Sequence, residues 1–320
     1  MDATAMNSQL NNHDAFISFL IDRLSRESSV SLNPHCLSER TLYSLFDEII
    51  AQGHRPQQSK ERTKEWLKEI GLLTPIAIDQ YPDSSKRSTR FYRLDVSRKA
   101  QSQPSPLELL QAYNEAGVIC YFTAIAFHSL STQPPVHHHL GIPIEPRPKA
   151  AQVLPRKVSV SRSESRKADP LGTWLFTYKG LRYYQTSREK RLIPGIQTRI
   201  TGPTSLIRIT VLEQTLLDTL HRPLSCGGPA VVMEAWEQGL GRVNEDKLER
   251  YLQKMDYLPI AQRLGYVLGS LGYRPGASLK NALDAYLARL DPNDPSAYQQ
   301  LFPGVKYDHL QYPWLVYGPA

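Results

Sequence analysis

The side chains best suited to bind an anionic partner are the cations between residues 54 and 99. This stretch holds eleven Lys or Arg against six Asp or Glu, in a chain whose net charge is +7. In SKERTKEWLKEIGLL the apolar residues share one helical face, and the cations lie off it. Cations on a helix bind phosphates, and the N-terminal part of a recognition helix reads base edges. The predicted contacts with double-stranded DNA are Ser59, Lys60, Arg62, Thr63, Lys64, Lys68, Lys86, Arg87 and Arg90.

Within that set, Arg62 and Thr63 are the expected base readers, and Lys86 and Arg87 fall at the tip of an expected hairpin. An alternative interpretation is a solvated helix face, because the glutamates at 61, 65 and 69 are interleaved with the lysines at helical spacing. The charge pattern alone leaves both interpretations open.

Other residues that could do chemistry form weaker patterns. His137, His138 and His139 are adjacent, so in an extended segment they point to alternating sides, which disfavours a shared metal ion. Glu245 and Lys247 have the E-x-K spacing of metal-dependent nucleases, but they lie in an expected exposed helix with no partner Asp evident. The chain contains no Walker A loop, G-x-S-x-G, HExxH or GxGxxG. We therefore expect no catalysis, no metal and no cofactor.

The elements around the basic helix follow the order of a winged helix-turn-helix. Asp14 is a plausible N-cap for a first helix, and a second helix from Ser38 ends near Gly53. After the basic helix, TPIAID and TRFYRLDV are predicted to be the two strands of a hairpin. The expected fold class is mixed α/β (α+β), with a winged helix-turn-helix over residues 1–100 and a larger mixed α/β domain over residues 101–320, subdivided near residue 204.

The join between these domains is predicted at SRKAQSQPSP, whose polar and proline content is typical of a linker, so each part should fold as a unit. Ser105 should start the next helix, with Pro106 in its first turn. Thr210 and Glu213 have the spacing of a capping box, which predicts another helix start there. The basic segment over residues 147–167 is either a second phosphate-binding segment or a solvated loop.

Length and composition are those of a globular protein of about two domains. Cys36, Cys120 and Cys226 are odd in number and far apart, which favours free thiols in a reducing compartment. The N-terminus lacks the apolar core of a signal peptide, and the longest apolar run is too short for a membrane helix. We therefore expect a cytoplasmic protein with no membrane partner.

Three segments in the second half give the chain a family resemblance: AGVICYFTAIAFHSL, TVLEQTLLDTLHRP with the following CGG, and IAQRLGYVLGSLG. Over about residues 105 to 275 the chain resembles the AbiEi-type antitoxins of bacterial abortive-infection toxin–antitoxin systems. An N-terminal winged helix agrees with that family's layout. The N-terminal domain here is longer than the compact version common in the family, and the basic segment over residues 147–167 lies outside the matching pattern.

The resemblance implies a repressor of its own operon that binds operator DNA through the winged helix. It also implies that the C-terminal region counteracts a nucleotidyltransferase-like toxin, with or without direct contact. The alternative is a non-catalytic DNA-binding scaffold or regulator in a larger defence complex.

Overall fold

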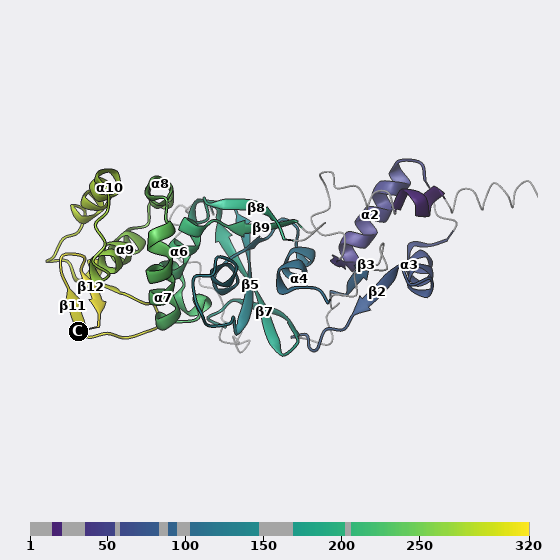
Figure 1. Ribbon diagram of the computed structural model, residues 1–320, viewed down its shortest axis with the longest axis horizontal. Coiled ribbons are helices and arrows are strands. Elements are labelled where there is room, and N and C mark those ends of the chain that lie inside the picture. Colours follow the sequence, from purple (N-terminus) through teal and green to yellow (C-terminus); the bar gives the residue numbers. More distant parts are fainter. Residues whose placement is uncertain are drawn as a thin grey trace, which may run out of the picture. The chain divides into compact units, whose positions relative to one another are not determined.

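The computed structural model has a mixed α/β fold and describes residues 15–20, 36–54, 58–82, 89–94, 103–146, 169–201 and 206–319. The chain divides into two compact units (Figure 1). The first comprises Met1–Ala116, Phe176–Gly180 and Thr198–Arg208, and the second comprises Gly117–Leu175, Leu181–Gln197 and Ile209–Ala320.

The first unit begins with a helix over residues 15–20, followed by β1 (Cys36–Ser38), α2 (Glu39–Ala51) and α3 (Lys60–Glu69). The strands β2 (Leu73–Ile76) and β3 (Phe91–Leu94) come next, and an antiparallel sheet forms in the order β1-β3-β2. The expected helices and strands are therefore present, and the hairpin's second strand also pairs with β1. Asp14, the hairpin tip over residues 83–88 and most of the expected linker lie outside the described residues.

The apolar spacing of α2 and α3 determines how they pack. Leu42, Phe46 and Ile49 of α2 form one stripe and are buried in a core with Leu67 of α3 and Leu73 of β2. Ser38 accepts a hydrogen bond from the amide of Thr41 at 3.2 Å, which caps α2. The stripe and the cap together place α2 directly after Ser38, as its sequence pattern predicts.

Helix α4 (Pro106–Tyr113) also belongs to the first unit and starts as expected. The Ser105 hydroxyl accepts from the amide of Glu108 at 3.3 Å, and the Glu108 carboxylate accepts from the amide of Ser105 at 2.7 Å. This reciprocal capping box, with Pro106 in the first turn, fixes the start of the helix.

A six-stranded sheet runs in the order β6-β7-β5-β4-β9-β8. It contains parallel and antiparallel pairs: β5 runs parallel to β7, β4 runs parallel to β9, and β4 runs antiparallel to β5. The strands are β4 (Val118–Ile119), β5 (His137–Ile144), β6 (Thr173–Tyr178), β7 (Leu181–Glu189), β8 (Ile196–Ile200) and β9 (Leu206–Thr210). Lys179 and Gly180 form the turn between β6 and β7, and both have positive φ.

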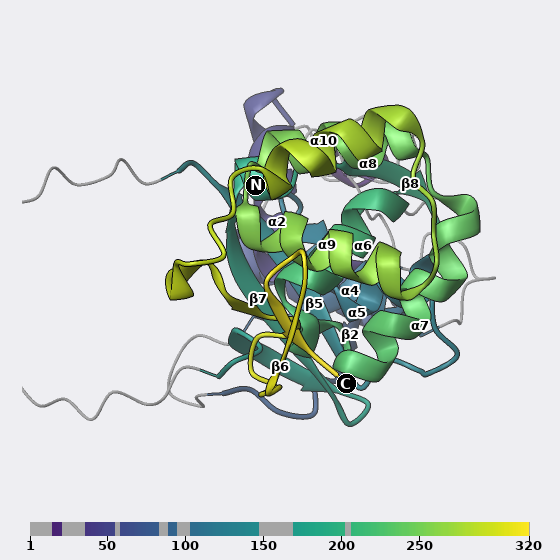
Figure 2. The ribbon, with the colours of Figure 1, turned by 90° about the vertical axis from the view of Figure 1, so that its left-hand side faces the viewer.

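The helices of the second unit cover one side of its strands. Figure 1 shows α6 and α7 between β5 and β7 on one side and helices α9 and α10 on the other, and in Figure 2 α9 and α10 lie in front of these strands. The helices are α5 (Phe122–Phe127), α6 (Leu212–His221), α7 (Pro229–Gly239), α8 (Glu245–Met255), α9 (Leu258–Ser270) and α10 (Ala277–Leu287). Near the C-terminus, β10 (Gln299–Gln300), β12 (Val316–Gly318) and β11 (His309–Gln311) form a small sheet, in that order.

The predicted capping box at Thr210 is wrong. Helix α6 starts at Leu212 after Val211, with no side-chain cap, because Thr210 is still the last residue of β9. The Thr210 hydroxyl is buried and hydrogen-bonds the hydroxyl of Thr215 at 2.8 Å. The Glu213 carboxylate accepts instead from the amide of Asn244 at 3.0 Å.

No helix in the described parts of the chain is both long and apolar enough to cross a membrane. The three cysteines are free, as their spacing indicated, and the structure shows that all three are buried.

Candidate nucleic-acid interface

The N-terminus of α3 is built by Ser59 and Thr63. The Ser59 hydroxyl accepts from the amide of Arg62 at 3.4 Å, so Ser59 is the N-cap of the helix. The Thr63 hydroxyl donates to the carbonyl of Ser59 at 3.1 Å, and the Thr63 side chain is fully buried. The expectation that Thr63 faces a base edge is therefore wrong, because its position on the helix turns it into the core.

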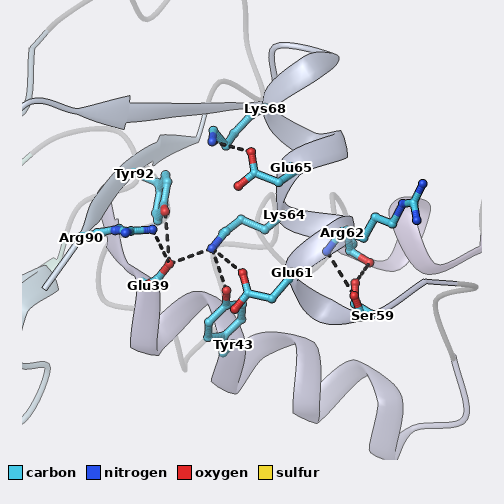
Figure 3. A network of polar contacts seen from close by, with 11 residues as sticks. Glu39, Tyr43, Ser59, Glu61, Arg62, Lys64, Glu65, Lys68, Arg90 and Tyr92 are labelled. Atoms are coloured by element: carbon cyan, nitrogen blue, oxygen red, sulfur yellow. Dashed lines mark hydrogen bonds and ion pairs between the residues drawn. The ribbon is translucent and has the colours of Figure 1, made fainter. Parts of the chain in front are cut away.

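Lys64 also lies on the inner side of α3, where only 3% of its side chain is exposed. Figure 3 shows its Nζ at the centre of a polar network, donating to Glu39 at 2.8 Å, to the Tyr43 hydroxyl at 2.8 Å and to Glu61 at 2.7 Å. Burial alone would lower the pKa of Lys64. The three hydrogen bonds together have a larger, opposite effect, so the pKa lies well above its ordinary value. The prediction that Lys64 is free to meet phosphate is wrong, because its charge is neutralised inside the first unit.

Glu39 connects this network to β3. Its Oε1 accepts from Lys64 and from the Tyr92 hydroxyl at 3.3 Å, and the Arg90 guanidinium lies 3.9 Å away (Figure 3). The charge of Glu39 raises the pKa of Arg90, whose side chain stays two-thirds exposed. Glu39 therefore ties together the start of α2, the middle of α3 and the strand that returns from the hairpin.

The other two lysines of α3 have carboxylate partners as well. Lys60 forms an ion pair with Asp47 of α2. The Nζ of Lys68 lies 2.6 Å from Glu65, and this hydrogen bond lowers the pKa of Glu65. Both pairs are partly exposed and contribute little to stability, so a phosphate can replace the carboxylate in each of them.

Arg62 differs from these lysines. It is exposed, its guanidinium has no partner among the described residues, and Figure 3 shows it directed away from the network. Lys86 and Arg87 lie outside the described residues. The structure therefore places Ser59, Lys60, Arg62 and Lys68 on the accessible part of α3, Arg90 beside it, and Thr63 and Lys64 underneath.

A second polar cluster, which the sequence analysis missed, lies inside the second unit. The Arg188 guanidinium makes a bidentate ion pair with the Asp218 carboxylate at 2.6 and 2.8 Å, and both side chains are buried. Burial lowers the pKa of Arg188, but the charge and hydrogen bonds of Asp218 raise it above its ordinary value. Gln214 donates to the same carboxylate at 2.7 Å, and Arg188 lies 5.2 Å from the ring centre of Tyr121.

The available signal for this pair was an aspartate inside an apolar helical stripe, since a buried charge requires a partner. Its partner is 30 positions away in the sequence, on a different element. The pair joins β7 to α6. This arrangement holds the two elements together.

The histidines of β5 are also buried. His137 hydrogen-bonds the carbonyl of Ser225 at 3.1 Å, and His139 the carbonyl of Leu171 at 2.9 Å. His138 instead contacts the Thr123 hydroxyl at 3.3 Å, so neighbouring rings do have different partners. No group of three or more His, Cys, Asp or Glu arranged to hold a metal ion occurs in the described ranges of the chain.

Two other polar side chains have structural contacts. His128 hydrogen-bonds the carbonyl of Thr210 at 2.7 Å. Glu245, of the E-x-K pair, accepts from the Tyr273 hydroxyl at 2.5 Å and from the amide of Gly276 at 2.8 Å. Its carboxylate therefore helps to join α8 to the segment before α10.

The fold has a counterpart among solved structures. It is similar to the crystal structure of the RV2827C protein from Mycobacterium tuberculosis, with a TM-score of 0.50 and 14% sequence identity. The match covers 94% of this chain and 90% of that one. No protein-family model matches the chain, and no curated protein matches it.

Proposed function

We propose that the first unit is a winged helix-turn-helix that binds double-stranded DNA, and that the protein is the repressor and antitoxin of a bacterial toxin–antitoxin pair. The observation that carries the DNA half is the element order: helix, β1, α2, α3, then the antiparallel β2 and β3 beside β1. In this arrangement α3 is the recognition helix and the hairpin is the wing.

The charges of the first unit support a specific form of that proposal. Arg62 lies near the N-terminus of α3, where a recognition helix meets base edges, and its guanidinium has no partner within the described ranges of the chain. A guanidinium donates two hydrogen bonds to O6 and N7 of guanine. Lys60 and Lys68, whose ion pairs are exposed, supply phosphate contacts by exchanging a carboxylate for a phosphate.

The antitoxin half rests on the resemblance to the AbiEi-type proteins. The three segments that carry it meet in one hydrophobic core of the second unit, which contains Cys120, Leu216, Cys226 and Ile260. The resemblance therefore lies in residues that build the core, and it supports a shared architecture for toxin neutralisation. It supplies no catalytic residue.

DNA binding is tested with the full chain and the DNA upstream of its own gene in a gel-shift assay. Arg62→Ala should weaken operator binding by about 5- to 150-fold, because one bidentate base contact is worth about 1 to 3 kcal/mol. Arg274→Ala, which removes an exposed arginine from the second unit, should bind like the original protein. Equal operator affinity for all three proteins would contradict the placement of α3 on DNA.

Antitoxin activity is tested by co-expression with the gene next to it, with growth as the readout. Growth rescue that persists in the Arg62→Ala protein would show that protection does not depend on repression. DNA binding without any growth rescue would favour the alternative function, a DNA-binding regulator or scaffold of a larger defence complex.

A further inference from the structure

The outward face of α3 carries more carboxylates than cations. An α-helix turns by about 100° per residue, so Arg62, Glu65 and Glu69 share one face, opposite the buried Thr63 and Leu67. All three are exposed. Carboxylates repel phosphates, so a face that only bound phosphates would carry fewer of them. The carboxylates of α3 therefore have a different role.

Glu65 is the carboxylate best placed to reach a base. The carboxylate of Glu61 is already turned toward Lys64, 2.7 Å away (Figure 3). Glu69 is the last residue of α3, far from the N-terminal part that enters the groove. The side chain of Glu65 is 53% exposed, and the positive charge of the neighbouring Lys68 offsets repulsion between the carboxylate and the DNA backbone.

The chemistry of a carboxylate restricts which base it can read. An exposed glutamate is ionised at neutral pH, and an ionised carboxylate only accepts hydrogen bonds. In the major groove cytosine presents an amino donor, whereas guanine and thymine present acceptors that repel a carboxylate. Adenine presents an amino donor next to an acceptor, so cytosine fits best.

We propose that α3 reads cytosine through Glu65 and guanine through Arg62, at neighbouring base pairs. Residues three apart on a helix differ by about 4.5 Å along its axis, which is close to the roughly 3.4 Å step of a DNA strand. This specificity rests on the proposed DNA binding and deepens it, because it assigns base preference to two named side chains.

The test is site selection from a random library of double-stranded DNA by the full chain, by Glu65→Gln and by Glu237→Gln. Glutamine has nearly the shape of glutamate but offers a donor and an acceptor, which match adenine. Glu237 is an exposed residue of α7 in the second unit, so its substitution makes the same charge change away from α3.

The original protein and Glu237→Gln should select a cytosine next to a guanine at the site. Glu65→Gln should lose its preference for cytosine by about 5- to 150-fold, the value of one good base contact, with adenine gaining most. Circular dichroism should show all three proteins equally folded, since neither substituted side chain is in the core.

Two results would overturn the inference, and they differ in what else they overturn. If Glu65→Gln selects the same cytosine with the same preference, or the original protein selects no such G·C pairs, the base assignment is wrong while DNA binding stands. If none of the proteins enriches any double-stranded DNA, the assignment and the proposed function are both wrong.

Discussion

Replacing Lys64 by methionine should lower the stability of the first unit without acting on DNA directly. Methionine keeps most of the side chain's apolar volume and removes the charge that binds Glu39, Glu61 and the Tyr43 hydroxyl. The Glu61 carboxylate is 70% exposed, so water replaces that hydrogen bond at little cost. The bonds to Glu39 and Tyr43 are more sheltered and are worth roughly 1 kcal/mol each. The expected loss is therefore about 2 kcal/mol.

The assay is urea unfolding of the full chain, followed by circular dichroism and by tryptophan fluorescence, to which Trp66 of the first unit contributes. Arg62→Met is the matched control, because Arg62 is on the same helix but exposed, and it should unfold like the original protein. Operator binding should show the reverse pattern, with Arg62→Met weakened and folded Lys64→Met nearly unchanged. A Lys64→Met protein of full stability that had lost DNA binding would refute this view of the network.

Three other predictions follow from buried contacts. Arg188→Met should cost about 3 to 5 kcal/mol in urea unfolding because it leaves the charge of Asp218 unpaired, and adding Asp218→Leu should recover most of that loss. Burial lowers the pKa of His139 to about 3, so below about pH 6.5 the unfolded chain binds a proton that the folded chain does not. The free energy of unfolding should therefore be intact above about pH 6.5 and fall by roughly 1.4 kcal/mol per pH unit below it. His139→Gln should make that fall less steep. Phe176→Ala should destabilise the first unit by about 3 to 5 kcal/mol in urea unfolding. A fragment of residues 1–100, which lacks Phe176, should be destabilised by a similar amount.

The last of these concerns the position of the join between the two parts of the chain. Phe176 is fully buried and packs on Phe91 of β3, with ring centres 5.1 Å apart. The amide of Gly180 also donates to the Asp79 carboxylate at 2.8 Å. The polar and proline content of a linker gives no information on these two contacts, because each joins segments about a hundred residues apart in the sequence. We therefore expect a fragment cut near residue 100 to expose apolar surface that the full chain buries.

Local signals predicted the elements well where the sequence and the three-dimensional surroundings agreed. At Ser105 the serine, the following proline and Glu108 all favour a helix start, and the capping box forms. Thr210 and Glu213 have the same spacing, but Thr210 ends β9 and its hydroxyl is buried against Thr215. The pairing of β9 in the sheet decides its conformation, and that pairing is not encoded in the four-residue pattern.

The interface was harder to predict than the helices, because the availability of a charge depends on tertiary contacts. The spacing of Glu65 and Lys68 allowed an ion pair to be anticipated, since residues three apart on a helix are neighbours. The pairs of Lys60 with Asp47 and of Lys64 with Glu39 join residues 13 and 25 positions apart, so spacing on one helix does not reveal them.

Charge counting treats every lysine of α3 as equally available to DNA, yet the surroundings separate them into two kinds. Lys64 is buried among hydrogen-bond acceptors, and its transfer to a phosphate would leave Glu39 and Tyr43 without it. Lys60 and Lys68 have partners that water also reaches, so a phosphate can replace those partners at little cost. Each such exchange releases a DNA counterion and adds about 0.9 to the salt slope, whereas Lys64 should add nothing. The difference in burial among these lysines, more than their number, should therefore set how strongly salt weakens binding.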